Sequence, residues 1–130
     1  MSDPTRRTFL KTAAFTIGMP TIIPASVLGK NGAIAPSNRI VLGAVGIGGR
    51  GRKVLDCFLA QPDLQFVAVA DVQAERAQRV RRMAMEKYAY DDCYTTSDMF
   101  EIFQRKDIDA VLTATGDRWH ALVSILAAKA

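Results

Sequence analysis

The sequence predicts an α/β protein, the N-terminal part of a doubly wound parallel sheet. Apolar runs of strand length alternate with segments whose apolar residues recur at helical spacing, and a glycine cluster joins the first run to the first helix. The runs are nearly continuous, which is typical of parallel strands covered by helices on both faces. This regular alternation indicates one domain, which we place at residues 36–130.

The first two strands and the helix between them begin the pattern. Ile40–Val45 reads IVLGAV and predicts the first strand. The following helix carries its apolar residues at helical spacing, namely Val54, Leu55, Phe58 and Leu59. Pro62 ends this helix, and Leu64–Ala70 (LQFVAVA) predicts a second, buried strand. The three elements predict a βαβ unit.

Further elements continue the alternation. A helix is predicted over residues 73–88, whose arginines could form an RNA face but are better interpreted as a solvated surface. The irregular segment over residues 91–94 (DDCY) has room for a very short strand. Thr96 and Ser97 are N-cap candidates for the next helix. Residues 109–115 (DAVLTAT) predict another buried strand, and a last helix begins at Asp117.

The predicted pattern stops partway through a fold. The chain ends at Ala130 inside the last predicted helix, without a glycine or polar C-cap. Only half of a six-stranded doubly wound sheet precedes that point. We therefore expect a fragment of a longer protein, truncated before a second α/β domain.

Charge and cysteine content argue against two classes of protein. Residues 1–35 carry four basic residues and one acidic residue, whereas the remainder carries 13 basic and 12 acidic, so the net charge of +4 belongs mostly to the N-terminal segment. A body without a positive excess argues against nucleic acid as a partner. Cys57 and Cys93 form no CxxC pair and have no histidines at ligand spacing. We therefore predict no metal site and no disulfide, and interpret both cysteines as small packing residues.

An export signal is predicted at the start of the chain. Residues 5–11 read TRRTFLK and precede a weakly apolar stretch over residues 12–29, which is too short and too polar for a typical membrane-spanning helix. The pattern resembles a twin-arginine signal, which implies the twin-arginine export machinery as a partner and a periplasmic or other extracytoplasmic location. We place the signal and linker at residues 1–35, with the leader ending between Gly29 and Ala35. A disordered basic tail and an uncleaved membrane anchor are the alternatives.

The glycine cluster fits the phosphate-binding pattern G-x-G-x-x-G and lies between a predicted strand and a predicted helix. In that pattern the first glycine permits a tight turn, the second lets a pyrophosphate approach, and the third lets helix and strand pack closely. Free N–H groups at the helix N-terminus can then bind the anion. The cluster consists of Gly46, Ile47, Gly48, Gly49, Arg50 and Gly51.

The second half of the pattern is Asp71, twenty residues beyond Gly51 at the end of the second strand, where a carboxylate can accept hydrogen bonds from ribose hydroxyls. We therefore predict bound NAD. A carboxylate would repel the 2′-phosphate of NADP, although Arg50 or Arg76 could weaken that preference. In one alternative the glycines serve only a turn and Asp71 only caps the next helix. In another the nucleotide is FAD or S-adenosylmethionine.

Residues 115–120 (TGDRWH), together with GIGGRGR, VAVAD and IDAVLTAT, resemble one family. They are similar to the cofactor-binding half of the Gfo/Idh/MocA oxidoreductases, the glucose–fructose oxidoreductase and inositol dehydrogenase family, and the similarity covers residues 38–130. The family commonly reads A-T-P-D-H-W-H at this place. Gly116 replaces the proline and Arg118 the first histidine, whereas the pattern is matched by Ala114, Thr115, Asp117, Trp119 and His120.

This resemblance implies roles for the matched residues. Thr113 and the two residues after it would line the nicotinamide side of the cofactor, with Trp119 and His120 beside it. His120 could donate a hydrogen bond to the carboxamide or shuttle a proton. The alternative is that His120 caps a helix while Trp119 fills the core. The family's Glu-Lys-Pro motif, whose lysine is implicated in catalysis, would follow Ala130, so no catalytic residue other than His120 can be nominated.

The resemblance also implies a function. It implies a Rossmann fold and an exported enzyme, homo-oligomeric when intact, that transfers hydride between a nicotinamide cofactor and a sugar, inositol or related polyol. The alternatives are NAD-assisted glycoside hydrolysis, a non-catalytic carbohydrate sensor that binds NAD, and a truncated product without activity. The 130-residue chain by itself is expected to be inactive. Because the twin-arginine pathway carries folded proteins, we hypothesise that the protein folds around NAD before export.

Overall fold

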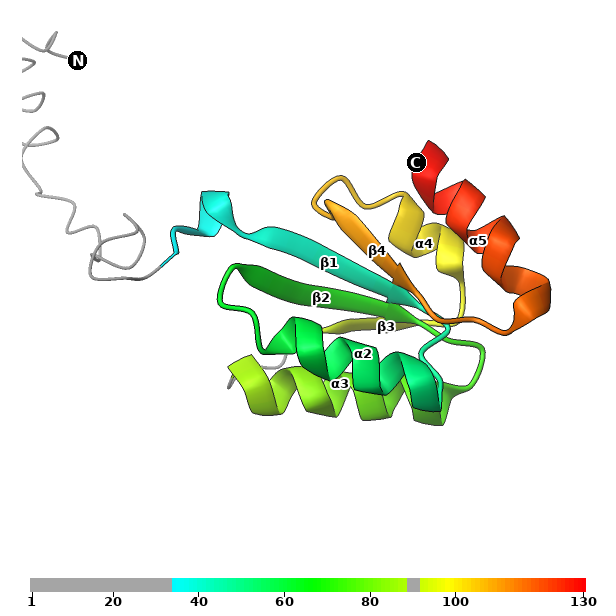
Figure 1. Cartoon of the computed structure of the whole chain (residues 1–130), viewed down its shortest axis with the longest axis horizontal. Helices are drawn as coiled ribbons and strands as arrows, with labels where there is room; N and C mark the ends of the chain where they lie inside the picture. The colour runs from blue at the N-terminus through cyan, green and yellow to red at the C-terminus, as the bar shows by residue number, and fades with distance from the viewer. Residues whose placement is uncertain (1–33, 89–91) are drawn as a thin grey trace, which may run out of the picture.

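The computed structural model describes residues 34–88 and 92–130. They form a four-stranded parallel sheet with helices on both faces (Figure 1), which confirms the predicted α/β class. In chain order the elements are η1 (Pro36–Asn38), β1 (Ile40–Val45), α2 (Gly49–Leu59), β2 (Leu64–Ala70), α3 (Ala74–Tyr88), β3 (Tyr94–Thr96), α4 (Met99–Phe103), β4 (Ala110–Thr113) and α5 (Asp117–Lys129).

The strand order is β3-β2-β1-β4, so the chain winds outward from β1 in one direction and then returns to the other side of β1. β1 pairs in parallel with β2 and with β4. The register with β2 shifts by one residue, because Leu42 pairs with Phe66 whereas Gly43 pairs with Ala68. The reversal of strand order between β1 and β4 creates the point at which open α/β sheets bind ligands.

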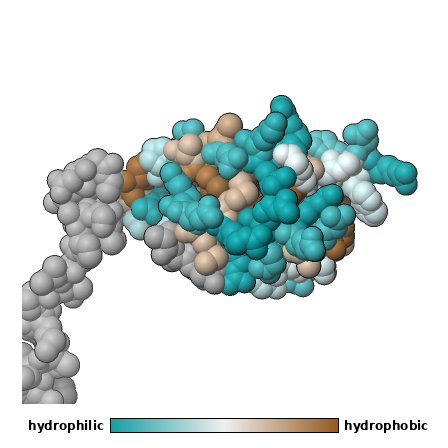
Figure 2. Space-filling model, turned by 90° about the horizontal axis from the view of Figure 1, so that it is seen from below, coloured by the Kyte–Doolittle hydropathy of each residue, from teal (hydrophilic) through white to brown (hydrophobic). Residues whose placement is uncertain are grey.

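The larger core lies between the sheet and the helices α2 and α3. Leu55 and Leu59 of α2 and Val80 of α3 are buried against Phe66 and Val69 of β2. The outer surface of these two helices is largely hydrophilic (Figure 2). This arrangement explains why the helical spacing of apolar residues was visible in the sequence of both helices.

A smaller core lies on the opposite face, under α4 and α5. It contains Ile102 of α4, Val123 of α5, and the buried residues Val45, Ala68 and Ala70 of the strands. α5 is covered on one side only, because Val123 is its single buried residue. The two sides of the sheet therefore differ in how much apolar surface they bury.

Some element boundaries and exposures differ from the sequence predictions. α4 is capped by Asp98, not by Thr96 or Ser97, because Asp98 Oδ1 accepts a hydrogen bond from the Phe100 N–H at 2.9 Å while Thr96 remains in β3. The strand predicted over residues 109–115 is only half-buried, since β4 pairs with β1 alone in the described sheet. Cys57 is exposed, so its predicted packing role is wrong, whereas Cys93 is buried in the larger core.

The predicted leader lies mainly outside the described residues, which begin at Ile34. Arg39 donates two hydrogen bonds from its guanidinium to the Ile34 carbonyl, at 3.3 and 3.2 Å, and so ties the start of the described chain to β1. Within residues 34–88 and 92–130, none of the helices has the length and apolarity needed to cross a bilayer. The twin-arginine signal and the domain boundary at residue 36 stay predictions.

Candidate functional site

A cavity of about 350 Å³ lies at the edge where the carboxyl ends of the parallel strands meet. Its walls come from the ends of β1, β2 and β4, from the start of α5, and from the segment that joins β3 to α4. We call it the carboxyl-end cavity. The lining residues that matter below are Gly46, Asp71, Arg76, Phe100, Thr115 and Trp119.

Gly46 forms the tight turn that leads from β1 toward α2. Its φ of +70° lies in the left-handed region that favours glycine. Its N–H donates to the Ala70 carbonyl at 2.8 Å, which fixes the turn to the end of β2. A Cβ at this position would also collide with the methyl group of Thr115. Gly46 is therefore required by the backbone and by the close approach of the β4 end.

The other two glycines of the pattern differ in what surrounds them. A Cβ on Gly51 would lie 2.6 Å from the Ala114 Cβ, so the close packing of α2 on the end of β4 requires glycine there. A Cβ on Gly48 would meet nothing nearer than Nη1 of Arg76 at 3.8 Å. The packing of the protein thus explains Gly51 but leaves Gly48 unexplained, and open space above Gly48 suits the approach of a ligand.

The remaining residues of the cluster lie on different sides of the turn. Ile47 is fully buried in the larger core, so only its backbone can reach a ligand. Gly49 and Arg50 are exposed in the first turn of α2. No side chain caps α2 at Gly48, and the first N–H groups of a helix have no intrahelical acceptor. These amides can therefore bind an anion such as a pyrophosphate.

Asp71 is buried, with 5% of its surface exposed. Its Oδ1 accepts a hydrogen bond from the Gln73 N–H at 2.9 Å, while its Oδ2 is buried without a hydrogen-bond partner. In the first turn of α3, the N–H groups of Arg76 and Ala77 donate to the Gln73 carbonyl and not to the Asp71 side chain. Capping of α3 therefore does not account for Asp71, and one carboxylate oxygen is left for another donor.

Thr115 is the second described residue with a buried polar atom that lacks a partner, at its Oγ1. Asp71 and Thr115 both line the carboxyl-end cavity, from opposite sides of Gly46. Buried polar atoms are normally hydrogen-bonded, so two such atoms around one cavity indicate a polar ligand. A nucleotide with ribose hydroxyls fits this arrangement, because each hydroxyl can both donate and accept.

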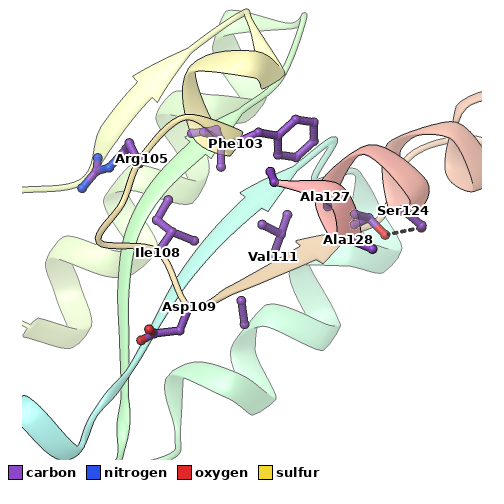
Figure 3. Close-up of a pocket in the computed structure, with 12 residues that line it drawn as sticks. Phe103, Arg105, Ile108, Asp109, Val111, Ser124, Ala127 and Ala128 are labelled. Carbon is purple, nitrogen blue, oxygen red and sulfur yellow. Dashed lines mark hydrogen bonds between the residues drawn. The ribbon is translucent and has the colours of Figure 1, made fainter.

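The three residues predicted to line the nicotinamide side, Thr113 to Thr115, do not all line the same cavity. Ala114 and Thr115 line the carboxyl-end cavity, but Thr113 lines a second cavity of about 360 Å³ between α4, β4 and α5 (Figure 3). Its Oγ1 lies 3.3 Å from the Ser124 Oγ, which in turn donates to the His120 carbonyl at 2.8 Å. Thr113 is the last residue of β4, whereas Ala114 and Thr115 follow the strand at the carboxyl edge, where the first cavity lies.

The second cavity offers less chemistry than the first. Its charged groups already have partners: Arg105 pairs with Asp107 at 2.6 Å, and Asp109 Oδ2 accepts from the Val41 N–H at 2.8 Å. The hydrogen bond from Arg105 lowers the pKa of Asp107. The rest of its lining is mostly aliphatic, with Ile108, Val111 and alanines of α5. We therefore take the carboxyl-end cavity as the candidate site.

Trp119 and His120 separate at the start of α5. Trp119 lines the carboxyl-end cavity and exposes 55% of its surface, so it does not fill the core. His120 is exposed and is not among the residues that line this cavity. Its N–H donates to the carbonyl of Gly116, the N-cap residue of α5. The described structure therefore brings Trp119, but not His120, to the site.

Sequence reasoning missed the wall that follows β3. Ser97, Asp98, Met99 and Phe100 all line the carboxyl-end cavity. A signal for them existed, because the carboxyl ends of parallel strands share one edge and residues after β3 must lie near those after β2. Their sequence indicated only the cap and the first apolar residues of a helix. Across residues 34–88 and 92–130, histidine, cysteine and acidic side chains do not gather in any group of three that could hold a metal ion.

Comparisons with known proteins agree with this geometry. The family model of the Gfo/Idh/MocA oxidoreductases, described as an oxidoreductase family with an NAD-binding Rossmann fold, matches residues 40–130. A curated glycosyl hydrolase family 109 protein from Saccharopolyspora erythraea is 30% identical, over 66% of this chain and 19% of that protein.

Two solved structures are also similar. A myo-inositol dehydrogenase from Corynebacterium glutamicum is 25% identical with a TM-score of 0.54, over 65% of this chain and 23% of that one. A myo-inositol dehydrogenase from Lactobacillus casei, in complex with NAD(H) and myo-inositol, is 24% identical with a TM-score of 0.59, over 71% of this chain and 26% of that one. At 24% identity, the similarity to the Lactobacillus casei structure shows the fold alone. The chain spans between 19 and 26% of these three proteins.

Proposed function

Because the chain belongs to the Gfo/Idh/MocA oxidoreductases with an NAD-binding Rossmann fold, we propose that its carboxyl-end cavity and glycine turn bind NAD. The observation that carries this proposal is the buried Oδ2 of Asp71, which has no hydrogen-bond partner and lies beside the turn. In this arrangement the amides at the start of α2 bind the pyrophosphate, and Asp71 accepts a hydrogen bond from a hydroxyl of the adenine ribose.

NAD is preferred over NADP for an electrostatic reason. Asp71 Oδ2 is buried without a hydrogen-bond partner, and an anionic 2′-phosphate at this place would face the buried carboxylate. Arg76 lines the same cavity and offers a partly compensating positive charge. We therefore expect a preference for NAD that is finite and weakens when the carboxylate is removed.

For the intact protein we propose hydride transfer to or from a sugar, inositol or related polyol. The 25% identity with the myo-inositol dehydrogenase of Corynebacterium glutamicum supports this substrate class. The cofactor supplies the hydride chemistry when it is bound. The residues of this chain bind and orient it: the α2 amides hold the pyrophosphate, Asp71 holds the ribose, and Thr115 and Trp119 form the wall after β4.

A second candidate is NAD-assisted glycoside hydrolysis, favoured by the 30% identity with a glycosyl hydrolase family 109 protein. Both candidates need the same cofactor site, so the site alone does not separate them. Incubation of the intact protein with a polyol and with an aryl glycoside separates them, since net NADH formation supports the dehydrogenase and release of the aryl alcohol without net NADH supports the hydrolase.

Equilibrium dialysis of the full chain against NAD and NADP tests the binding proposal. We expect NAD to bind more tightly than NADP, and we expect Asp71→Ala to weaken NAD binding while NADP binding changes less. Asp56→Ala removes an exposed carboxylate of α2 that is not among the residues lining the cavity, and serves as the matched control. Unchanged NAD affinity in Asp71→Ala would contradict the ribose assignment.

We also propose that the intact protein is exported by the twin-arginine machinery with NAD already bound, to a periplasmic or other extracytoplasmic location. The support is the TRRTFLK segment together with a cofactor site built from the folded sheet. Replacement of Arg6 and Arg7 by lysine should leave folded, NAD-loaded precursor in the cytoplasm, measured by fractionation and cofactor extraction. Continued export of the variant would refute it. The homo-oligomer implied by the family resemblance stays a prediction.

A further inference from the structure

The described packing does not account for the position of Phe100. This phenylalanine of α4 leaves 47% of its surface exposed, although its neighbour Ile102 is fully buried in the smaller core. The exposed ring lines the carboxyl-end cavity. What sets the Phe100 ring apart is its place at the wall of this cavity, since ligand pockets are lined mainly by apolar and aromatic side chains.

The backbone and ring of Phe100 are both held in place. Its N–H donates to Asp98 Oδ1 at 2.9 Å, and the Asp98 N–H donates to Thr96 Oγ1 at 3.1 Å, so the segment is tied to the end of β3. The ring meets Phe103 edge-on, with 6.1 Å between centroids and 90° between planes. Phe103 packs against the smaller core. Phe100 is therefore a fixed wall, with its exposed surface available to a ligand.

The strand order decides which part of a dinucleotide reaches Phe100. Along the carboxyl edge the order is the segment after β3, then Asp71 after β2, then Gly46 after β1, then Thr115 after β4. A dinucleotide with its pyrophosphate over β1 and its adenine ribose on β2 extends its adenine toward β3. Trp119 comes from the start of α5, after β4, and so lines the cavity from the side farther from β3.

We propose that Phe100 is the surface against which the adenine base of the cofactor stacks, which makes it an additional cofactor-contacting residue. The inference rests on the proposed NAD binding. Stacking of a base on an aromatic ring uses the π-face that every purine offers and needs no hydrogen bond. Phe100 then supplies affinity for the adenosine half, while Asp71 distinguishes NAD from NADP.

Calorimetric titration of the full chain with NAD and with ADP-ribose, which lacks the nicotinamide, tests this assignment. We expect Phe100→Ala to weaken both ligands by the same factor, about 5- to 100-fold, as loss of one base–aromatic contact does. Phe100→Trp should restore binding, because it keeps an aromatic face. Phe58→Ala is the matched control, since Phe58 on α2 is 38% exposed and is not among the residues lining the cavity.

The possible outcomes separate the two proposals. If the unmodified chain binds neither ligand, the proposed NAD binding fails and this inference fails with it. If the unmodified chain binds and Phe100→Ala binds equally well, only the adenine assignment is overturned. It is also overturned if Phe100→Ala weakens NAD but not ADP-ribose, because Phe100 would then serve the nicotinamide side. Circular dichroism of each variant checks that the sheet and helices remain.

Discussion

Replacement of Gly48 by alanine should weaken NAD binding and leave folding unchanged. Gly48 has φ −76° and ψ −161°, which an alanine can adopt without strain. The nearest heavy atom to an added Cβ is Nη1 of Arg76, at 3.8 Å, so the methyl group meets no steric conflict in the protein itself. It does enter the open space in front of the α2 amides, where we place the pyrophosphate.

The effects of Gly48→Ala on the free energy of unfolding and on NAD affinity have separate causes. For folding, alanine lowers the entropy of the unfolded chain, which stabilises by about 0.4–1 kcal/mol. Alanine is a poorer N-cap than glycine, which costs a comparable amount, so the free energy of unfolding should stay within about 0.5 kcal/mol. For binding, loss of one hydrogen bond between an amide and a charged phosphate costs about 1.5–3 kcal/mol, or roughly 10- to 100-fold in affinity.

Gly51→Ala provides the opposite control. Its added Cβ would lie 2.6 Å from the Ala114 Cβ, so the end of β4 must move. Overpacking of this kind costs about 1–3 kcal/mol of stability. Gly48→Ala should therefore weaken NAD binding at unchanged stability, whereas Gly51→Ala should lower the stability of the fold.

Urea denaturation followed by circular dichroism gives the stabilities. Titration with NADH gives the affinities through the emission of Trp119, the single tryptophan of the chain, which lines the cavity. The reasoning is refuted if Gly48→Ala binds as tightly as the unmodified chain, or if it loses binding only because it unfolds.

Three further predictions concern stability. Gly116→Pro should stabilise by about 0.4–1 kcal/mol in urea denaturation, because Gly116 has a proline-like φ of −63° and its Cβ would meet nothing within 4 Å; a lower midpoint would refute this. Asp107→Asn should cost less than about 1 kcal/mol at neutral pH, since the exposed pair with Arg105 is screened by solvent. Because that hydrogen bond lowers the folded pKa of Asp107 below its ordinary 3.8, the difference should be fully present above pH 3.8 and disappear as the pH falls through the folded value, and a pH-independent difference would contradict it. Tyr88→Phe should cost about 1–3 kcal/mol, because its hydroxyl accepts from one backbone N–H of β2 and donates to one carbonyl; an unchanged midpoint would show that these bonds contribute nothing.

The sheet and the turn could be predicted because local sequence patterns encode them. β1 and β2 are continuous apolar runs, and the structure gives them the predicted bounds. Gly46 and Gly51 are constrained by the ends of neighbouring strands, which the phosphate-binding pattern already encodes. Asp71 follows β2 directly, so its place at the carboxyl edge follows from the parallel topology.

The parts that escaped prediction depend on where an element ends and how it is oriented, which sequence patterns do not specify. The cap of α4 depends on where β3 ends: Thr96 still pairs with β2, and Asp98, directly before Met99, accepts from the Phe100 N–H. The direction of Thr113 depends on the phase of β4, which a motif match does not specify. The exposure of Phe100 depends on how α4 crosses the sheet, which local helical spacing does not determine.

The most direct test of the account is a titration of the isotope-labelled full chain with NAD, followed by amide NMR shifts. We predict that the largest shifts occur at the glycine turn (residues 46–51), at Asp71, at residues 97–100 and at residues 114–116, around the carboxyl-end cavity. Shifts confined to the second cavity, around Ile108, Val111 and Ser124, or the absence of any shift at saturating NAD, would contradict the assignment of this site.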